Sequence, residues 1–347
     1  MRSDLHCSSS IIEIDLTSKN LSSCLVKTTS DEVNKRLLTE NFETNTSLLS
    51  TFGILTDVQF AEHETHISFE NKHRFYKNSL NLVKEAVCCW KDYGKVDFVL
   101  QLGDIIDGKC KVSNESLSSL NLVLDELKKS QEEAKILHVW GNHEFYNFKR
   151  SELIHSELNS AWNLKQNIDK PCNYYFYDVT NNLRMICLDF YEFSVLGYEE
   201  TDNEYLEASK YIESLGKSEN YTYPKINGAI KGEQLKWLEE QLNLCKNENK
   251  KAIVCGHNPL SKEASKEKFV SLNAAQILEL LWSYDHVIIA YVSGHFHQGG
   301  YFRDKCDIHH ITLPGIIEKH PGSNSFMTVK VFEEKICFYL NNSESHI

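Results

Sequence analysis

The amino-acid sequence predicts an α/β fold, in which helices cover the faces of β-sheets. From residue 51 onward, short apolar runs typical of buried strands alternate with stretches whose apolar residues recur at helical spacing. Hydrophobic residues make up 41% of the 347-residue chain and aromatic residues 11%, enough for a large core. The alternating region contains no internal repeat and no linker, so we predict one domain over residues 49–343.

The first half of this region predicts three strands separated by helices. The strands are the apolar runs FGILT at 52–56, VDFVLQL at 96–102 and ILHVW at 136–140. A helix follows the first strand, because apolar residues from Phe75 to Trp90 recur on one helical face. A second helix is predicted around Leu117–Leu127, and a polar helical stretch follows His143.

The second half continues the alternation and closes with a hairpin. Four further strands are predicted at 184–190 (RMICLDF), 251–256 (KAIVCG), 286–294 (HVIIAYVSG) and 309–315 (HHITLPG). The helices GEQLKWLEEQL at 232–242 and LNAAQILELLW at 272–282 lie between them. TVKVF and KICFYL, at 328–332 and 335–340, predict the closing hairpin.

Two segments fall outside this pattern. Residues 1–48 are rich in Ser, Thr and Asn, and predict an N-terminal extension that is poorly ordered or forms a peripheral strand. Residues 191–224 have no strand run but many aromatic and charged side chains. A long insertion of this kind is usually functional, so we predict a substrate lid whose aromatic side chains stack on a base or ring of the substrate. The alternative is a solvated helical excursion with its own small core.

Composition narrows the classes of partner and compartment. The net charge of −12 and the absence of a Lys/Arg stripe argue against a nucleic-acid partner. The eleven cysteines are scattered without a C-x-x-C pair, which is typical of free thiols in a reducing compartment. No signal-peptide core is present, and no apolar run approaches the ~20 residues that span a bilayer. We therefore predict a soluble cytoplasmic protein without a membrane partner; no feature indicates its oligomeric state.

Five hydrophobic runs end in side chains that bind metals. The candidate ligands at these strand ends are Asp57, Gln59, Asp104, Asn142, His257, His295 and His297. In α/β sheets the carboxyl ends of strands are where ligands bind. Glycine precedes Asp104, Asn142, His257 and His295, so the backbone can pack closely and Asp104 can bridge two cations. Mixed oxygen and nitrogen ligands without thiolate suit Mn²⁺, Fe or Zn²⁺.

These motifs, in this order, resemble those of the calcineurin-like metallophosphoesterase superfamily over residues 51–320. The resemblance implies a four-layer α-β-β-α sandwich with mixed β-sheets. It implies that Asp104 bridges two metals. The first metal would be held by Asp57, Gln59, Asp104 and His297, and the second by Asp104, Asn142, His257 and His295.

One departure from the superfamily pattern narrows the resemblance. The usual first motif is Asp-x-His, whereas this chain has Asp57-Val58-Gln59. Asp-x-Gln, together with GDIIDG, GNHEFYNF and HRFYKNSL, resembles the manganese-dependent ADP-ribose/CDP-alcohol diphosphatases. This implies hydrolysis of the pyrophosphate of small nucleoside diphosphate compounds, such as ADP-ribose and CDP-choline, to a nucleoside monophosphate and a phosphomonoester. Two Mn²⁺ ions are implied, although Mg²⁺, Fe or Zn²⁺ would also fit. An amide in place of imidazole should weaken its metal site and favour a readily exchanged Mn²⁺.

The resemblance also implies a mechanism. A hydroxide held by the metals would attack phosphorus in line, without a covalent enzyme intermediate. His143 would protonate the leaving oxygen or stabilise the charged transition state, and Asp107 would hydrogen-bond His143 and keep it protonated. Arg74 is a candidate contact for the substrate phosphate, unless it is a surface residue. Asn227 is a second candidate substrate contact, unless Asn227-Gly228 is only a turn.

Other functions on the same scaffold stay open to different degrees. A cyclic-nucleotide phosphodiesterase, or another phosphomonoesterase or phosphodiesterase, would use the same metal chemistry. Serine/threonine phosphatases have Arg after the second Asp, where this chain has Gly108, and purple acid phosphatases have Tyr where Asp107 stands. A scaffold without catalysis is disfavoured, because every expected ligand position is filled.

Overall fold

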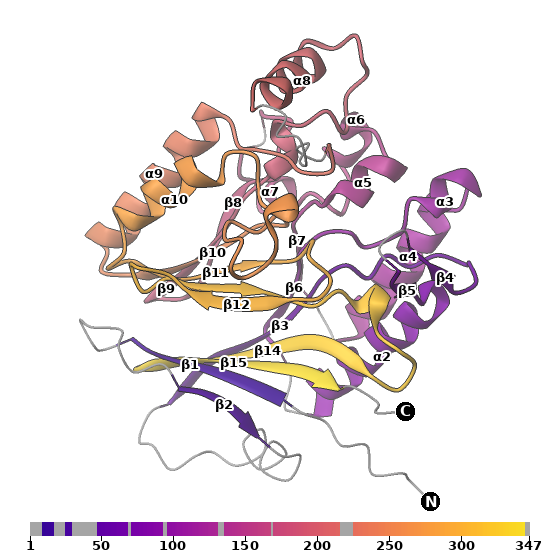
Figure 1. Ribbon diagram of the computed structural model, residues 1–347. Helices are drawn as coiled ribbons and strands as arrows, with labels where there is room; N and C mark the ends of the chain where they lie inside the picture. Colours follow the sequence, from indigo (N-terminus) through magenta and orange to yellow (C-terminus); the bar gives the residue numbers. More distant parts are fainter. Residues whose placement is uncertain are drawn as a thin grey trace, which may run out of the picture.

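Two mixed β-sheets stack face to face, and helices cover the outer face of each (Figure 1). The structure is a computed structural model that describes residues 9–16, 25–29, 47–68, 71–92, 96–130, 135–167, 169–215 and 225–343. This arrangement is the four-layer α-β-β-α sandwich that the sequence motifs predicted.

The first sheet has seven strands in the order β2-β1-β15-β14-β3-β6-β7. Its strands are β1 (Ser9–Asp15), β2 (Leu25–Thr29), β3 (Leu48–Leu55), β6 (Phe98–Gln101), β7 (Lys135–His138), β14 (Asn324–Phe332) and β15 (Lys335–Ser343). Strands β3, β6 and β7 run parallel, and the remaining pairs are antiparallel. The parallel half brings the carboxyl ends of β3, β6 and β7 to one edge.

The second sheet has six strands in the order β12-β13-β11-β10-β9-β8. Its strands are β8 (Tyr175–Thr180), β9 (Leu183–Cys187), β10 (Lys251–Cys255), β11 (Ile288–Ser293), β12 (Gly300–Arg303) and β13 (His309–Thr312). The four central strands are parallel, and β8 and β12 are antiparallel edges. The carboxyl ends of β10 and β11 therefore also share one edge.

Side chains that alternate along each strand fill two different parts of the core. Phe98 and Leu100 of β6 pack between the two sheets, together with Met185 of β9 and Ile253 of β10. Val99, between the two β6 residues, points instead into the core shared with the helices. This period of two is what a strand buried on both faces produces.

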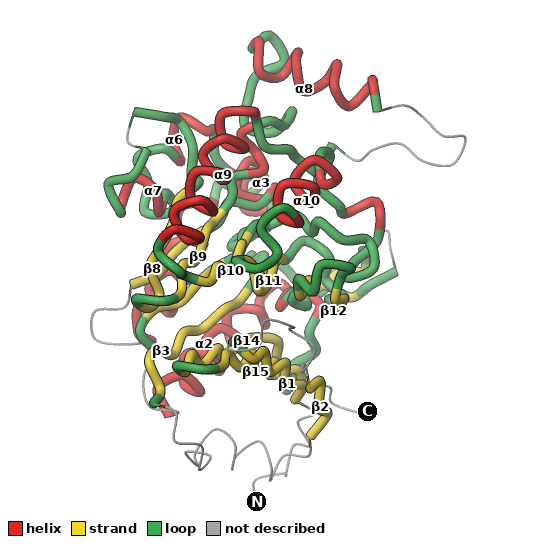
Figure 2. Tube along the Cα trace, turned by 90° about the vertical axis from the view of Figure 1, so that its left-hand side faces the viewer, coloured by secondary structure: helices red, strands yellow, loops and turns green. Residues whose placement is uncertain are grey.

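Four helices form the two outer layers. They are α2 (Tyr76–Asp92) and α4 (Ser116–Leu127) beside the seven-stranded sheet, and α9 (Gly232–Asn247) and α10 (Ala274–Trp282) beside the six-stranded sheet (Figures 1 and 2). The remaining elements include β4 (His66–Ile67), β5 (His73–Arg74), α3 (Lys109–Val112), α5 (Asn142–Asn147), α6 (Arg150–Leu153), α7 (Ser160–Asn163) and α8 (Asn203–Ser214). Short one-turn helices are η1 (Lys128–Ser130), η2 (Phe190–Glu192), η3 (Glu267–Phe269) and η4 (Ile316–Glu318).

The predicted strands and long helices are confirmed, and the closing hairpin is β14–β15. The N-terminal segment supplies β1 and β2, of which β1 pairs with β15 at the edge of the first sheet. The aromatic insertion contains α8, which projects away from both sheets (Figure 2); residues 216–224 lie outside the described part. The domain boundary at residue 48 stays a prediction.

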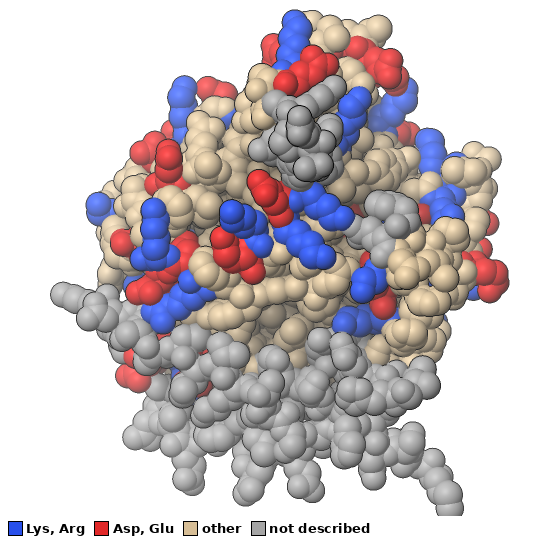
Figure 3. Space-filling view, viewed as in Figure 1, with Lys and Arg blue, Asp and Glu red and all other residues tan. Residues whose placement is uncertain are grey.

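The surface charges, the cysteines and the helix lengths indicate little about a specific function. On the face shown in Figure 3, acidic and basic side chains are interspersed rather than gathered into a basic surface. Among the described residues, nine cysteines form no disulfide. In the same part of the chain, every helix is too short or too polar to cross a bilayer.

Candidate metal centre

The predicted ligands follow the carboxyl ends of five strands, drawn from both sheets. Asp57 and Gln59 follow β3, Asp104 follows β6, and Asn142 follows β7 at the first turn of α5. His257 follows β10, and His295 and His297 follow β11. Because the two sheets are stacked with these ends on the same side, the loops of one sheet meet those of the other.

The backbone at four of these residues adopts an unusual left-handed conformation. The φ angle is 51° at Asp57, 42° at Gln59, 59° at Asp104 and 66° at His295. For residues other than glycine this region is sparsely populated, at a cost of roughly 1–3 kcal/mol each. The surrounding hydrogen bonds maintain it: Asp57 N and Gln59 N donate to the carbonyls of Gly103 and Asp104, at 3.1 and 2.9 Å. Such concentrated strain is typical of functional sites.

Two glycines let these loops approach closely. A Cβ on Gly103, whose φ is 100°, would lie 2.5 Å from Nδ1 of His257. A Cβ on Gly141 would collide with the Oδ1 atom of Asp104. The sequence prediction that glycine permits close packing beside the ligands is therefore confirmed at both positions.

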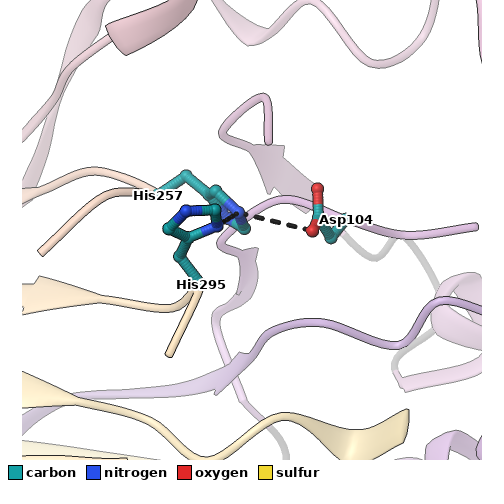
Figure 4. Close-up of side chains that lie close together, drawn as sticks. All are labelled: Asp104, His257 and His295. Atoms are coloured by element: carbon teal, nitrogen blue, oxygen red, sulfur yellow. Dashed lines mark hydrogen bonds and ion pairs between the residues drawn. The ribbon is translucent and has the colours of Figure 1, made fainter. Parts of the chain in front are cut away.

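Asp104, His257 and His295 form one compact group (Figure 4). Their ligand atoms all lie within 4.8 Å of one another, and all three residues are buried. Nε2 of His257 lies 3.4 Å from Asp104 Oδ2 and 3.1 Å from Nδ1 of His295. A carboxylate and two imidazoles that converge in this way could hold one divalent cation.

Asp57 and His297 form a second group beside the first. Nε2 of His297 lies 3.1 Å from Oδ1 of Asp57 and 3.1 Å from Nε2 of Gln59. Gln59 Nε2 also donates to Oδ2 of Asp104 at 3.1 Å. The Oδ2 atom of Asp104 therefore lies between the two groups, where a bridging ligand is required.

Each of the three histidines has its second ring nitrogen held by an acceptor. Nδ1 of His257 donates to the carbonyl of Leu102 at 2.7 Å, and Nδ1 of His297 to Oε1 of Glu318 at 2.9 Å. Nε2 of His295 lies 2.8 Å from the amide oxygen of Asn227. These contacts turn the opposite nitrogen of each ring toward the carboxylates, which is how ligating histidines are usually fixed.

The electrostatics of the group favour positive charge beside Asp57 and Asp104. Burial alone would lower the pKa of His257, but Asp104 outweighs it and raises the value to about 9. Burial also lowers the pKa of His297, but the charge of Asp57 outweighs burial and raises this pKa to about 9. The two buried carboxylates thus favour positive charge at these rings. Two carboxylates and three oriented imidazoles fit a pair of divalent cations.

The pocket over this group has a volume of about 410 Å³. It is lined by Gln59, Arg74, Asp104, Asn142, His143, Tyr146, Ile226, Lys268, Phe269, His295, His297 and Gln298. A volume in this range suits a small-molecule ligand. The described residues of the aromatic insertion do not line it, so its role as a lid stays a prediction.

Comparison with known proteins agrees with this geometry. The model of the family described as calcineurin-like phosphoesterase matches residues 50–299. The chain belongs to this family. The resemblance predicted from the motifs is confirmed.

Curated relatives and a solved structure extend the match over most of the chain. The chain is 33% identical over 324 residues to the manganese-dependent ADP-ribose/CDP-alcohol diphosphatase of Homo sapiens, covering 88% of this chain and 93% of the relative. It is 31% identical to the protein of the same name from Arabidopsis thaliana, covering 83% and 93%. A dimetal phosphatase from Danio rerio superposes with a TM-score of 0.77 at 29% identity, covering 86% of this chain and all of that one.

Within this calcineurin-like fold, Gln59 is oriented differently from a metal ligand. Its Nε2 faces Asp104 and His297, while Oε1 accepts a hydrogen bond from Arg74 at 3.0 Å. An NH₂ group cannot ligate a cation, so a metal here requires the amide to rotate by half a turn. The ligand role of Gln59 therefore stays a prediction.

His143, Asp107 and Arg74 lie together at the rim of the site. His143 Nδ1 accepts from the backbone N–H of Gly108 at 3.1 Å and lies 3.4 Å from Oδ2 of Asp107. Its Nε2 is 3.9 Å from Oδ2 of Asp104. Nη1 of Arg74, a residue of β5, lies 3.9 Å from Oδ2 of Asp107. His143 and Arg74 both line the pocket, within reach of a bound ligand.

Asn227 does not lie where a substrate contact would. Its side chain has no exposed surface, and it lies behind His295. Both amide hydrogens are already donated to the backbone carbonyls of Lys268 and Val270. The structure gives it contacts with a predicted ligand and with a loop instead.

Two acidic residues hold the site but were given no role from the sequence. Glu318 fixes His297, although it lies 21 residues further along the chain. Glu144 accepts from the backbone N–H groups of Asp104, Ile105 and Gly141, at 2.9, 2.8 and 2.6 Å. Burial and the charge of Asp104 raise the pKa of Glu144 to about 7, although the three backbone N–H donors lower it. Its place in the GNHE motif was the one available signal.

Replacing Glu144 with alanine should destabilise the fold. Glu144→Ala leaves three buried N–H groups unpaired, and we expect a loss of about 3 kcal/mol or more in the free energy of unfolding. Urea unfolding with an unchanged m value would measure it. Glu233→Ala, at an exposed position of α9, should leave stability unchanged. Equal stability of both variants would show that the Glu144 contacts contribute little.

Proposed function

We propose that this protein is a dinuclear-metal hydrolase that cleaves the pyrophosphate of small nucleoside diphosphate compounds, such as ADP-ribose and CDP-choline. The observation that carries the proposal is the convergence of Asp57, Asp104, His257, His295 and His297 under a pocket of about 410 Å³. The named activity of the curated relatives supports the choice of substrate class.

We assign the resident metal as Mn²⁺, following the manganese dependence in the relatives' names. Asp57, Gln59, Asp104 and His297 would hold one ion, and Asp104, Asn142, His257 and His295 the other. When bound, the two ions supply an activated water and neutralise charge on the phosphoryl oxygens. The protein's contribution is a dry, fixed set of ligands, of which Asp57 and Asp104 are 0 and 1% exposed.

The remaining chemistry falls to residues at the pocket wall. His143 presents Nε2 toward the pocket, where it can donate a proton to the leaving phosphate oxygen. Arg74 can bind a substrate phosphate, because this residue lines the same pocket. The cytoplasmic location predicted from the free cysteines forms part of this proposal.

A substrate panel tests the proposal directly. With Mn²⁺, we expect AMP from ADP-ribose and CMP from CDP-choline, and lower rates with Mg²⁺. Cyclic AMP and nitrophenyl phosphate in the same panel test the alternative esterase functions. Turnover of cyclic AMP alone would replace the proposed substrate class with a cyclic-nucleotide phosphodiesterase.

A further inference from the structure

The buried amide of Asn227 contacts two separate parts of the site. Nδ2 donates to the carbonyls of Lys268 and Val270, at 3.0 and 2.9 Å. Oδ1 lies 2.8 Å from Nε2 of His295. Because both amide hydrogens go to carbonyls, which only accept, the orientation of the amide is fixed. Its oxygen must therefore face His295.

This orientation sets the tautomer of His295. An amide oxygen only accepts, so Nε2 of His295 carries the proton and Nδ1 keeps its lone pair. Nδ1 lies 3.1 Å from Nε2 of His257, on the side where Asp104 also converges. Asn227 thus prepares His295 to bind a cation through Nδ1.

The same amide holds the segment that forms one wall of the pocket. We call residues 258–272 the substrate loop, since Lys268 and Phe269 line the pocket. The two carbonyls bound by Asn227 bracket Phe269, whose ring packs edge-on against His295 with 5.4 Å between centroids. The position of this part of the loop therefore depends on Asn227.

The aromatic insertion stabilises this arrangement from behind. Val195, Ala208 and Ile212 of the insertion form a small core with Ala229 and Leu272. Ala229 is two residues from Asn227, and Leu272 ends the substrate loop. The N–H of Leu272 also donates to the carbonyl of Gly228 at 3.0 Å. The insertion thus supports both segments joined by the Asn227 amide.

We propose that Asn227 is a positioning residue that couples metal binding to the order of the substrate loop. A cation on Nδ1 restricts the His295 ring, the ring restricts the Asn227 amide, and the amide restricts the carbonyls of Lys268 and Val270. By linkage, an ordered loop strengthens metal binding to the same extent. The inference rests on the metal site of the proposed function but not on its substrate.

Three variants separate the contact of Asn227 with His295 from its contacts with the substrate loop. Asn227→Asp keeps an acceptor for His295 but loses both donors and places an oxygen against two carbonyls. Asn227→Leu has a similar volume and loses every hydrogen bond. Ser271→Ala is the matched control, because it removes the hydroxyl that contacts the carbonyl of Gly228 and the amide oxygen of Asn273, and it leaves the contact with His295 in place.

Hydrogen exchange by mass spectrometry, with and without Mn²⁺, measures the order of residues 258–272. Mn²⁺ titration followed by electron paramagnetic resonance measures the affinity of each variant for Mn²⁺. In the wild type, Mn²⁺ should slow exchange in the loop by about 5–150-fold. Asn227→Asp should bind Mn²⁺ normally without this protection. Asn227→Leu should lose the protection and bind Mn²⁺ about 10–100-fold more weakly. Ser271→Ala should keep both.

The outcomes distinguish this inference from the proposed function. Wild-type protein that binds Mn²⁺ without protecting the loop overturns the coupling and leaves the hydrolase proposal standing. Wild-type protein that binds no Mn²⁺ overturns the metal site itself. Full protection in a folded Asn227→Asp variant would also overturn the coupling, and this variant remains informative if Asn227→Leu does not fold.

Discussion

Asp104→Asn should abolish turnover of every substrate that the protein hydrolyses. Oδ2 of Asp104 lies between the two ligand groups, 3.1 Å from Gln59 Nε2 and 3.4 Å from His257 Nε2. An asparagine has nearly the same shape but carries no charge and only one acceptor oxygen. The two cations would then have no anionic ligand in common. Without this ligand they would not be held together, and the activated water would be lost.

The same substitution should remove the stabilisation by metal. In the wild type, Mn²⁺ at a hundred times its dissociation constant should raise the free energy of unfolding by about 2.7 kcal/mol. Thermal unfolding with increasing Mn²⁺ should show this shift for the wild type and little for Asp104→Asn. Asp285→Asn, at a largely exposed site, is the matched control and should behave as wild type. A wild-type response in Asp104→Asn would refute the bridging role.

The fold and most of the site could be predicted because their signals are local. The buried strands are short apolar runs, and several ligands follow a glycine directly after a strand. The parallel order of β3, β6 and β7 then brings Asp57, Asp104 and Asn142 to one edge. Periodicity along the chain predicts such strand ends without any knowledge of long-range contacts.

The supporting residues could not be predicted, because their partners are far away in sequence. Glu318 reaches His297 through the turn η4, and Asn227 reaches His295 across 68 residues. A glutamate or an Asn-Gly pair has no local pattern that identifies such a partner. The insertion illustrates the same limit: Phe193, Tyr205 and Tyr211 pack against a small core behind the loop. Aromatic content alone does not identify this packing, and a lid over the substrate stays a prediction.

His143→Ala should slow catalysis by about 10²–10⁴-fold, the usual scale for losing a general acid. Metal binding should be retained, because no predicted ligand is held in place by the imidazole of His143. The hydrogen bond from His143 to Asp104 Oδ1, at 2.8 Å, comes from the backbone N–H, which the alanine variant keeps. Steady-state kinetics with CDP-choline and Mn²⁺ titration would measure both effects. His286→Ala, at an exposed position, is the matched control.

The leaving group can separate the two roles open to His143. A general acid matters most when the leaving oxygen is strongly basic, whereas a residue that stabilises charge on the phosphoryl group is less sensitive to the leaving group. Phenyl and 4-nitrophenyl esters of a nucleoside monophosphate differ in this respect, since nitrophenolate leaves more readily. A larger defect of His143→Ala on the phenyl ester would assign proton donation to Nε2, the nitrogen that is not hydrogen-bonded to Gly108. Equal defects on both esters would assign charge stabilisation instead.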